Sequence, residues 1–94
     1  MNRFTVVWWQ FAKSKLAHLW LNATDKTDKA AVTRAADEMD RRLAEDPESC
    51  AEDRHEQLCR LTIDPLTVQF TIDDHDRIVT VWTVRRSDIQ SSRP

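Results

Sequence analysis

The 94-residue sequence contains no glycine and no tyrosine. Backbone nitrogens that cradle a phosphate usually belong to a glycine-rich loop, so a nucleotide site of that kind is excluded. Any turn that needs a positive φ must use another residue, and Asp and Asn tolerate that conformation best. The expected turns are rich in Asp, which agrees with this requirement.

Long apolar runs and an excess of positive charge are also absent. No run approaches the roughly 18 apolar residues of a membrane span, and the first residues lead into strand-like sequence rather than a signal peptide. The net charge is −2, whereas a protein that binds chiefly to phosphates is usually basic. We therefore expect a cytoplasmic protein that is not a general nucleic-acid binder. Cys50 and Cys59 fit that compartment as reduced thiols.

Length and composition predict one domain over residues 4–86 and a flexible tail over residues 87–94. Apolar residues make up 40% of the chain and charged residues 32%, which is an ordinary globular balance. We find no internal repeat or low-complexity segment.

Residues 58–86 organise the fold. Residues 66–72 alternate between apolar and polar without a fault, the period of a half-buried strand, and residues 59–63 and 77–84 follow the same pattern. The short connections at residues 64–65 and 73–76 favour an antiparallel meander. Its apolar face needs a cover and carries Leu66, Val68, Phe70 and Ile72.

The upstream half predicts that cover. Residues 4–8 read as a first strand with Trp8 on the apolar face, and residues 10–22 as a helix. The apolar stripe of that helix consists of Ala12, Leu16, Leu19, Trp20 and Ala23. A longer helix spans residues 27–46, capped by Asp25 or Thr27 and ended by Pro47. Its buried stripe consists of Val32, Ala35, Ala36, Met39 and Leu43.

The resulting prediction is an α+β fold of order β-α-α-β-β-β, a helical hairpin packed on an antiparallel sheet. On the outer face of the long helix we expect three ion pairs at four-residue spacing: Asp37–Arg41, Glu38–Arg42 and Arg41–Glu45. Residues 48–57 are expected to form a connecting loop.

Several single residues have both a structural and a functional interpretation. Arg54 stands alone among four acids of its loop and is either a salt-bridge partner or a substrate contact. Arg60, Arg85 and Arg86 are either solvated strand residues or binding cations, and His55 is a candidate for proton transfer. Trp82 is out of phase with its strand, so it faces away from the helices as partner surface unless a bulge turns it inward.

The acidic turn at residues 73–76, which includes His75, has no zinc-like ligand spacing, and its residue types suit a turn. We therefore expect no metal, and no cofactor.

Six different short segments follow one another along the chain in a characteristic order. They are VVW at 6–8, LAHLWL at 16–21, LAEDP at 43–47, EDR at 52–54, DPLTVQF at 64–70 and DRIVTVWTV at 76–84. In this order they resemble the RelE/ParE superfamily of toxins from bacterial toxin–antitoxin pairs, which includes plasmid-stabilisation proteins. The resemblance covers about residues 4–86 and is more specific to the fold than to the activity.

The resemblance implies two possible activities. RelE-like members cut messenger RNA on the ribosome without a metal, using scattered basic residues, whereas ParE-like members poison DNA gyrase. Both kinds are held by a small cognate antitoxin. Carried over to this sequence, the RelE-like catalytic positions are Arg54, Arg60 and Arg85, with Arg86 as the alternative to Arg85. The expected partner-binding residues are Trp82, because of its phase in the strand, and Arg86.

The same comparison favours the ParE-like, gyrase-directed activity. Thr67 occupies a strand position where RelE-like nucleases tend to have arginine, and the missing tyrosine removes a frequent proton donor. The alternatives are a metal-independent endoribonuclease of the RelE type, and a non-toxic interaction module on the same fold. None of the three requires a membrane or a small-molecule cofactor.

Overall fold

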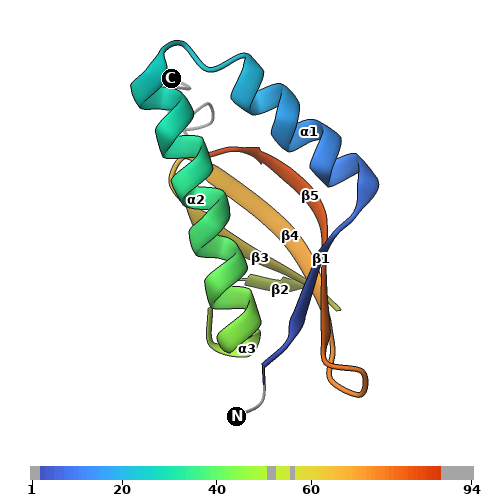
Figure 1. Cartoon of the computed structure of the whole chain (residues 1–94). Coiled ribbons are helices and arrows are strands. Elements are labelled where there is room, and N and C mark those ends of the chain that lie inside the picture. Colours follow the sequence, from blue (N-terminus) through green and yellow to red (C-terminus); the bar gives the residue numbers. More distant parts are fainter. Residues whose placement is uncertain (1–2, 51–52, 56, 88–94) are drawn as a thin grey trace.

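The alternating segments form the centre of a five-stranded sheet with the strand order β1-β5-β4-β3-β2 (Figure 1). The computed structural model describes residues 3–50, 53–55 and 57–87. Its elements are β1 (Thr5–Trp8), α1 (Gln10–Leu21), α2 (Lys26–Glu45), α3 (Pro47–Cys50), β2 (Asp53–His55), β3 (Leu58–Ile63), β4 (Leu66–Asp73) and β5 (Ile78–Arg86). β1 is parallel to β5, and every other pair is antiparallel.

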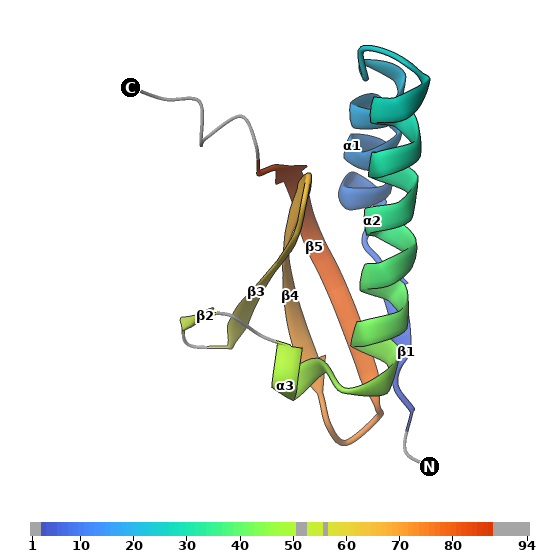
Figure 2. The same cartoon turned by 90° about the vertical axis from the view of Figure 1, so that its left-hand side faces the viewer.

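Figure 2 shows α1 and α2 together on one side of the sheet, which confirms the predicted α+β arrangement. The helical hairpin and the meander agree with the expected order. The sheet is mixed rather than wholly antiparallel, because β1 joins it at an edge in parallel with β5, a position that the sequence left open. The domain limits remain a prediction, and residues 88–94 of the expected tail lie outside the described residues.

The core forms where the stripe of α2 meets the apolar face of the sheet. Met39 and Leu43 are completely buried, as are Val68 and Phe70 of β4. Burial of each such side chain is worth about 1.5–3 kcal/mol. Ile72, near the end of β4, is only partly covered at the margin of this cluster.

The segment predicted as a loop, residues 48–57, contains two short elements. Pro47 ends α2 as expected, but it also opens α3, because its fixed φ suits the first position of a helix. Asp46 supports this turn by accepting a hydrogen bond from the Ser49 N–H at 3.3 Å. β2 consists of three polar residues and has no apolar alternation, so only its pairing with β3 reveals it as a strand.

The caps and ion pairs of α2 follow the prediction with one exception. Asp25 is the N-cap and accepts a hydrogen bond from the Asp28 N–H at 2.9 Å. Among the described residues the expected Asp37–Arg41 pair is wrong, because Arg41 binds Glu38 and Glu45 instead. Glu38 also pairs with Arg42.

A β-bulge divides β5 into two segments. Phe70 of β4 pairs with Val81, but its neighbour Gln69 pairs with Thr83, so Trp82 has no partner in the register. The extra residue restarts the alternation, and Val84 is therefore buried although Val81 is also buried. Both alternatives considered for Trp82 are partly right: the strand is bulged, and the indole nevertheless faces outward.

The turn between β4 and β5 contains a residue with positive φ, the conformation that glycine adopts most easily. The residue with positive φ is Arg77, at 58°, and not an Asp or Asn. A left-handed conformation costs such a residue about 1–2 kcal/mol. The Arg77 guanidinium lies 4.7 Å from the centre of the Phe4 ring, a contact that offsets part of this cost.

Candidate functional site

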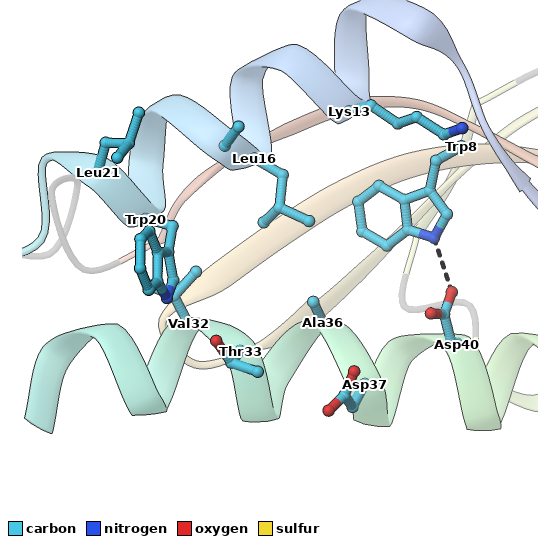
Figure 3. Close-up of a pocket in the computed structure, with 11 residues that line it drawn as sticks. Trp8, Lys13, Leu16, Trp20, Leu21, Val32, Thr33, Ala36, Asp37 and Asp40 are labelled. Carbon is cyan, nitrogen blue, oxygen red and sulfur yellow. Dashed lines mark hydrogen bonds between the residues drawn. The ribbon is translucent and has the colours of Figure 1, made fainter. Parts of the chain in front are cut away.

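A groove of ≈ 560 Å³ opens between α1 and α2 and ends at β1. Figure 3 shows Leu16 and Trp20 extending from α1 toward α2, with Trp8 entering from the other end. The Trp8 indole N–H donates a hydrogen bond to Asp40 Oδ1 at 2.7 Å, which holds the ring against α2. The groove therefore has an apolar floor between two tryptophans and a polar rim on α2.

Lys29 fixes the other end of the groove. Its Nζ donates hydrogen bonds to the carbonyl oxygens of Trp20 at 2.9 Å and Leu21 at 3.5 Å, satisfying carbonyls that have no partner within α1. The same ammonium lies 4.4 Å from the centre of the Trp20 ring. Trp20 as a whole remains 40% exposed. One lysine thus stabilises both the end of α1 and an aromatic wall.

The sequence places Trp8 and Trp20 on apolar faces but does not reveal the groove. Ala12 is buried as expected, and Leu16 and Leu19 are partly covered. Trp20 lies in the same predicted stripe, yet α2 covers it only in part. Periodicity predicts which face of α1 is apolar but not how far apart two helices pack.

Two candidate arginines share the sheet face opposite the helices. Arg60 of β3 pairs with Gln69, and Arg85 of β5 pairs with Thr67, so both belong to the outward rows. They are two strands and two residues apart, which corresponds to about 12 Å between their Cα atoms. Thr67 lies between Arg85 and Thr62, is 4% exposed, and shares a hydroxyl hydrogen bond of 3.0 Å with Thr62.

The register of β2 places the backbones of two further candidates, Arg54 and His55, at the edge of the sheet beside β3. The backbone of Arg54 pairs with Cys59, a buried thiol, whereas that of Asp53 pairs with Arg60. The backbone of His55 pairs with Leu58. No side-chain geometry is described for residues 53–55, so the roles of Arg54 and His55 remain predictions.

Arg86 lies on the helix side of the sheet, where it binds Asp28 of α2 through two nitrogens, at 3.0 and 3.1 Å. The hydrogen bonds from Arg86, followed by the one from the Thr24 backbone N–H, hold the pKa of Asp28 below its usual range. The predicted role of Arg86 in partner binding therefore requires this pair to open.

Trp82 forms an exposed aromatic pair with Trp9. Their ring centroids are 5.4 Å apart with an interplanar angle of 47°, and the two residues are 38% and 44% exposed. The Trp82 indole N–H donates to the Thr71 hydroxyl at 2.8 Å, which fixes the ring on the outer face. The position is compatible with the predicted partner surface but does not test it.

Within the described ranges, no three His, Cys, Asp or Glu side chains are grouped so that they could hold a metal ion. The helices of the same residues include none with the length and apolarity that crossing a bilayer requires. The acidic turn after β4 has a structural role, because Asp73 Oδ1 accepts a hydrogen bond from the Asp76 N–H at 3.1 Å.

No protein-family model and no curated protein matches this sequence. Solved structures do. The RelBE2 toxin–antitoxin complex of Mycobacterium tuberculosis matches at 20% identity and a TM-score of 0.67, covering 92% of this chain and 93% of the other. A chromosomal ParDE system from P. aeruginosa matches at 12% identity and a TM-score of 0.68, covering 92% and 98%.

A chain of the RelE–RelB complex of Pyrococcus horikoshii matches at 14% identity and a TM-score of 0.62, covering 93% of this chain and 97% of the other. The likeness spans nearly the whole of each chain. It shows a shared fold.

Proposed function

We propose that this chain, which has the fold common to RelE and ParE proteins, is the toxin of a type II toxin–antitoxin pair. A small cognate antitoxin holds it inactive. The support is twofold: the similar structures come from RelBE and ParDE systems, and the chain carries a preformed apolar groove.

The groove is the observation that carries the proposal. An apolar floor between Trp8 and Trp20, open along its length, suits the apolar face of a partner helix. Both rings are fixed by polar contacts, Trp8 by Asp40 at the rim and Trp20 by Lys29 at the end of the groove, so a partner meets a surface that is already ordered. The antitoxin is therefore proposed to lay a helix between α1 and α2.

For the cellular target we propose a ParE-like, gyrase-directed action. RNA cleavage without a metal needs cations around the scissile phosphate and a group that moves protons. The outer face offers Arg60 and Arg85, but Thr67, the neighbour of Arg85 on β4, is a buried neutral residue, and Arg86 is bound to Asp28. Among the described side chains of β3, β4 and β5 there is no histidine.

Each preorganised contact of a catalytic site can be worth roughly 100- to 1000-fold in rate. This chain lacks two such groups, a cation at the position of Thr67 and a tyrosine, so a site built from its remaining residues would cut RNA slowly. RelE-like cleavage remains the second candidate because Arg60 and Arg85 do share one face of the sheet.

The test is induced expression in a bacterial host, alone and together with the product of the adjacent small gene. Growth arrest that the neighbour relieves supports the toxin. Growth without arrest supports the non-toxic interaction module. Purified protein is then assayed for DNA supercoiling by gyrase and for mRNA cleavage on programmed ribosomes, and inhibition of gyrase without cleavage is expected.

A further inference from the structure

One stripe of α2 runs along the groove and continues past its Trp20 end into an adjoining hollow, and its charge changes sign on the way. The stripe consists of residues spaced three or four apart, which share one side of a helix: Lys26, Ala30, Thr33, Asp37 and Asp40. From Lys26 to Asp40 it extends about 21 Å at 1.5 Å per residue. Four turns of a partner helix match that length.

The basic half lies at the α1–α2 turn. A second hollow of ≈ 490 Å³ adjoins the groove there, beside Trp20. Its charged lining residues are Lys26, Lys29, Arg34 and, at the boundary with the acidic half, Asp37. Lys29 is already bonded to the end of α1. Lys26 and Arg34 are exposed, and neither has an ion-pair partner within the described part of the chain. Two cations therefore remain available beside Trp20.

The acidic half lies toward β1. Asp37 is exposed and, over the described residues, has neither its expected partner Arg41 nor any other. Asp40 uses Oδ1 to hold Trp8, and its carboxylate remains exposed at the rim. Lys13 of α1 is the only cation among the side chains that line this described groove, so the formal charge of the lining is −1.

We propose that the occupant of the groove is an amphipathic helix of about four turns with a divided charge. Its apolar ridge fills the space between Trp8 and Trp20, its cations face Asp37 and Asp40, and its acids face Lys26 and Arg34. This inference rests on the proposed antitoxin and adds the feature that selects it. An antitoxin of uniform charge places like charges against one half of the stripe, which penalises a non-cognate partner.

The experiment uses three synthetic helical peptides that share one leucine ridge and a length of about 16 residues. The first carries lysines in one half and glutamates in the other, the second carries glutamines throughout, and the third carries glutamates throughout. Binding to the full chain is measured by calorimetry and by the change in intrinsic tryptophan fluorescence, to which Trp8 and Trp20 contribute. The divided peptide is expected to bind about tenfold tighter than the glutamine peptide at low salt.

Salt separates the charge contribution from the apolar one. At about 1 M NaCl the Debye length is about 3 Å, so the first two peptides should bind almost equally. The all-glutamate peptide should bind more weakly than the glutamine peptide at low salt.

Matched variants locate the effect. Asp37→Lys should weaken the divided peptide about tenfold and leave the glutamine peptide unchanged. Its control, Asp74→Lys, makes the same charge change in the exposed turn after β4. Arg34→Glu should likewise weaken the divided peptide, with Lys15→Glu on α1 as its control. Thermal melts establish that all four variants remain folded.

Equal affinity for the divided and glutamine peptides would overturn the inference, as would an Asp37→Lys effect no larger than that of Asp74→Lys. So would the absence of binding by every peptide up to about 1 mM. The proposed function is tested separately, because growth arrest and its relief by the neighbouring gene do not involve these peptides.

Discussion

Arg86 at the end of β5 and Asp28 in the first turn of α2 form a bidentate ion pair, with Nη1–Oδ2 at 3.0 Å and Nη2–Oδ1 at 3.1 Å. The Asp28 carboxylate also accepts a hydrogen bond from the Thr24 N–H at 3.1 Å. Three segments therefore meet at one carboxylate: the α1–α2 turn, the start of α2 and the end of the sheet.

This pair predicts a specific loss of stability in acid. Because Arg86 and then Thr24 lower the pKa of Asp28 in the folded state, its contribution is complete above the ordinary carboxyl pKa of about 4 and is lost as the pH falls through the lower folded value. Thermal melts from neutral to acid pH should show the Tm decreasing in that range. Asp28→Asn should lower the Tm at neutral pH and flatten the decrease.

Glu38 must be separated from this effect, since hydrogen bonds from Arg41 and then Arg42 lower its pKa to about 2. Glu38→Gln should remove a different part of the acid dependence, the part that is lost as the pH falls toward about 2. Asp37→Asn is the control, because Asp37 has no partner within the described residues. A Tm profile of Asp28→Asn that parallels the parent would contradict the role of the pair.

Met39→Asp tests the cover of the sheet. Met39 is completely buried, so an aspartate there is either a buried charge or a neutral acid without a partner, and several kcal/mol of stability should be lost. Urea unfolding measures the loss. Thr33→Asp introduces an aspartate at an exposed position of the same helix and should change the free energy of unfolding by less than about 0.5 kcal/mol.

Arg77 and Phe4 should be energetically coupled. Arg77→Asn relieves a left-handed arginine but removes its contact with the Phe4 ring, so the two effects oppose each other. In a Phe4→Leu background only the relief remains, and the substitution should stabilise the chain by up to about 1 kcal/mol. A double-mutant cycle should give a coupling of roughly 0.5–1 kcal/mol, and additive effects would show that the ring contact contributes nothing.

Arg60→Ala and Arg85→Ala decide between the two targets. If the action is ParE-like and does not depend on RNA cleavage, neither variant should abolish growth arrest or the inhibition of gyrase supercoiling. If the action is RelE-like, either substitution should reduce cleavage on programmed ribosomes by roughly 100-fold or more. Codon-dependent cuts that disappear in these variants would overturn the preference for gyrase.

The regular parts of the fold were predictable because their patterns are long. The seven alternating residues of β4 and the stripe of α2 each repeat often enough to identify the buried face. β2 was missed because its three polar residues have no pattern of their own and form a strand only by pairing with the edge of β3. A positive φ at Arg77 was equally hidden, since the ring that offsets its cost is 73 residues earlier in the sequence.

The candidate site was less accessible to sequence reasoning than the fold. Arg85 and Arg86 could each have faced outward, and only the bulge at Trp82 decides that Arg85 does so while Arg86 reaches Asp28. The groove depends on the gap between α1 and α2 and on the hydrogen bond from Trp8 to Asp40, neither of which has a periodic signature.

The bulge in β5 makes Trp82 a residue that the strand can lose. Without it, residues 78–81 and 83–86 would join into one unbroken alternation: Val79, Val81, Val84 and Arg86 would keep their inward positions, and Thr83 and Arg85 their outward ones. A chain from which Trp82 is deleted should therefore fold with the same core and the same Arg86–Asp28 pair. It would lack only the exposed indole on the outer face. Lineages could add or remove that side chain by a three-base insertion or deletion, a change that would reverse the faces of any other strand in this sheet.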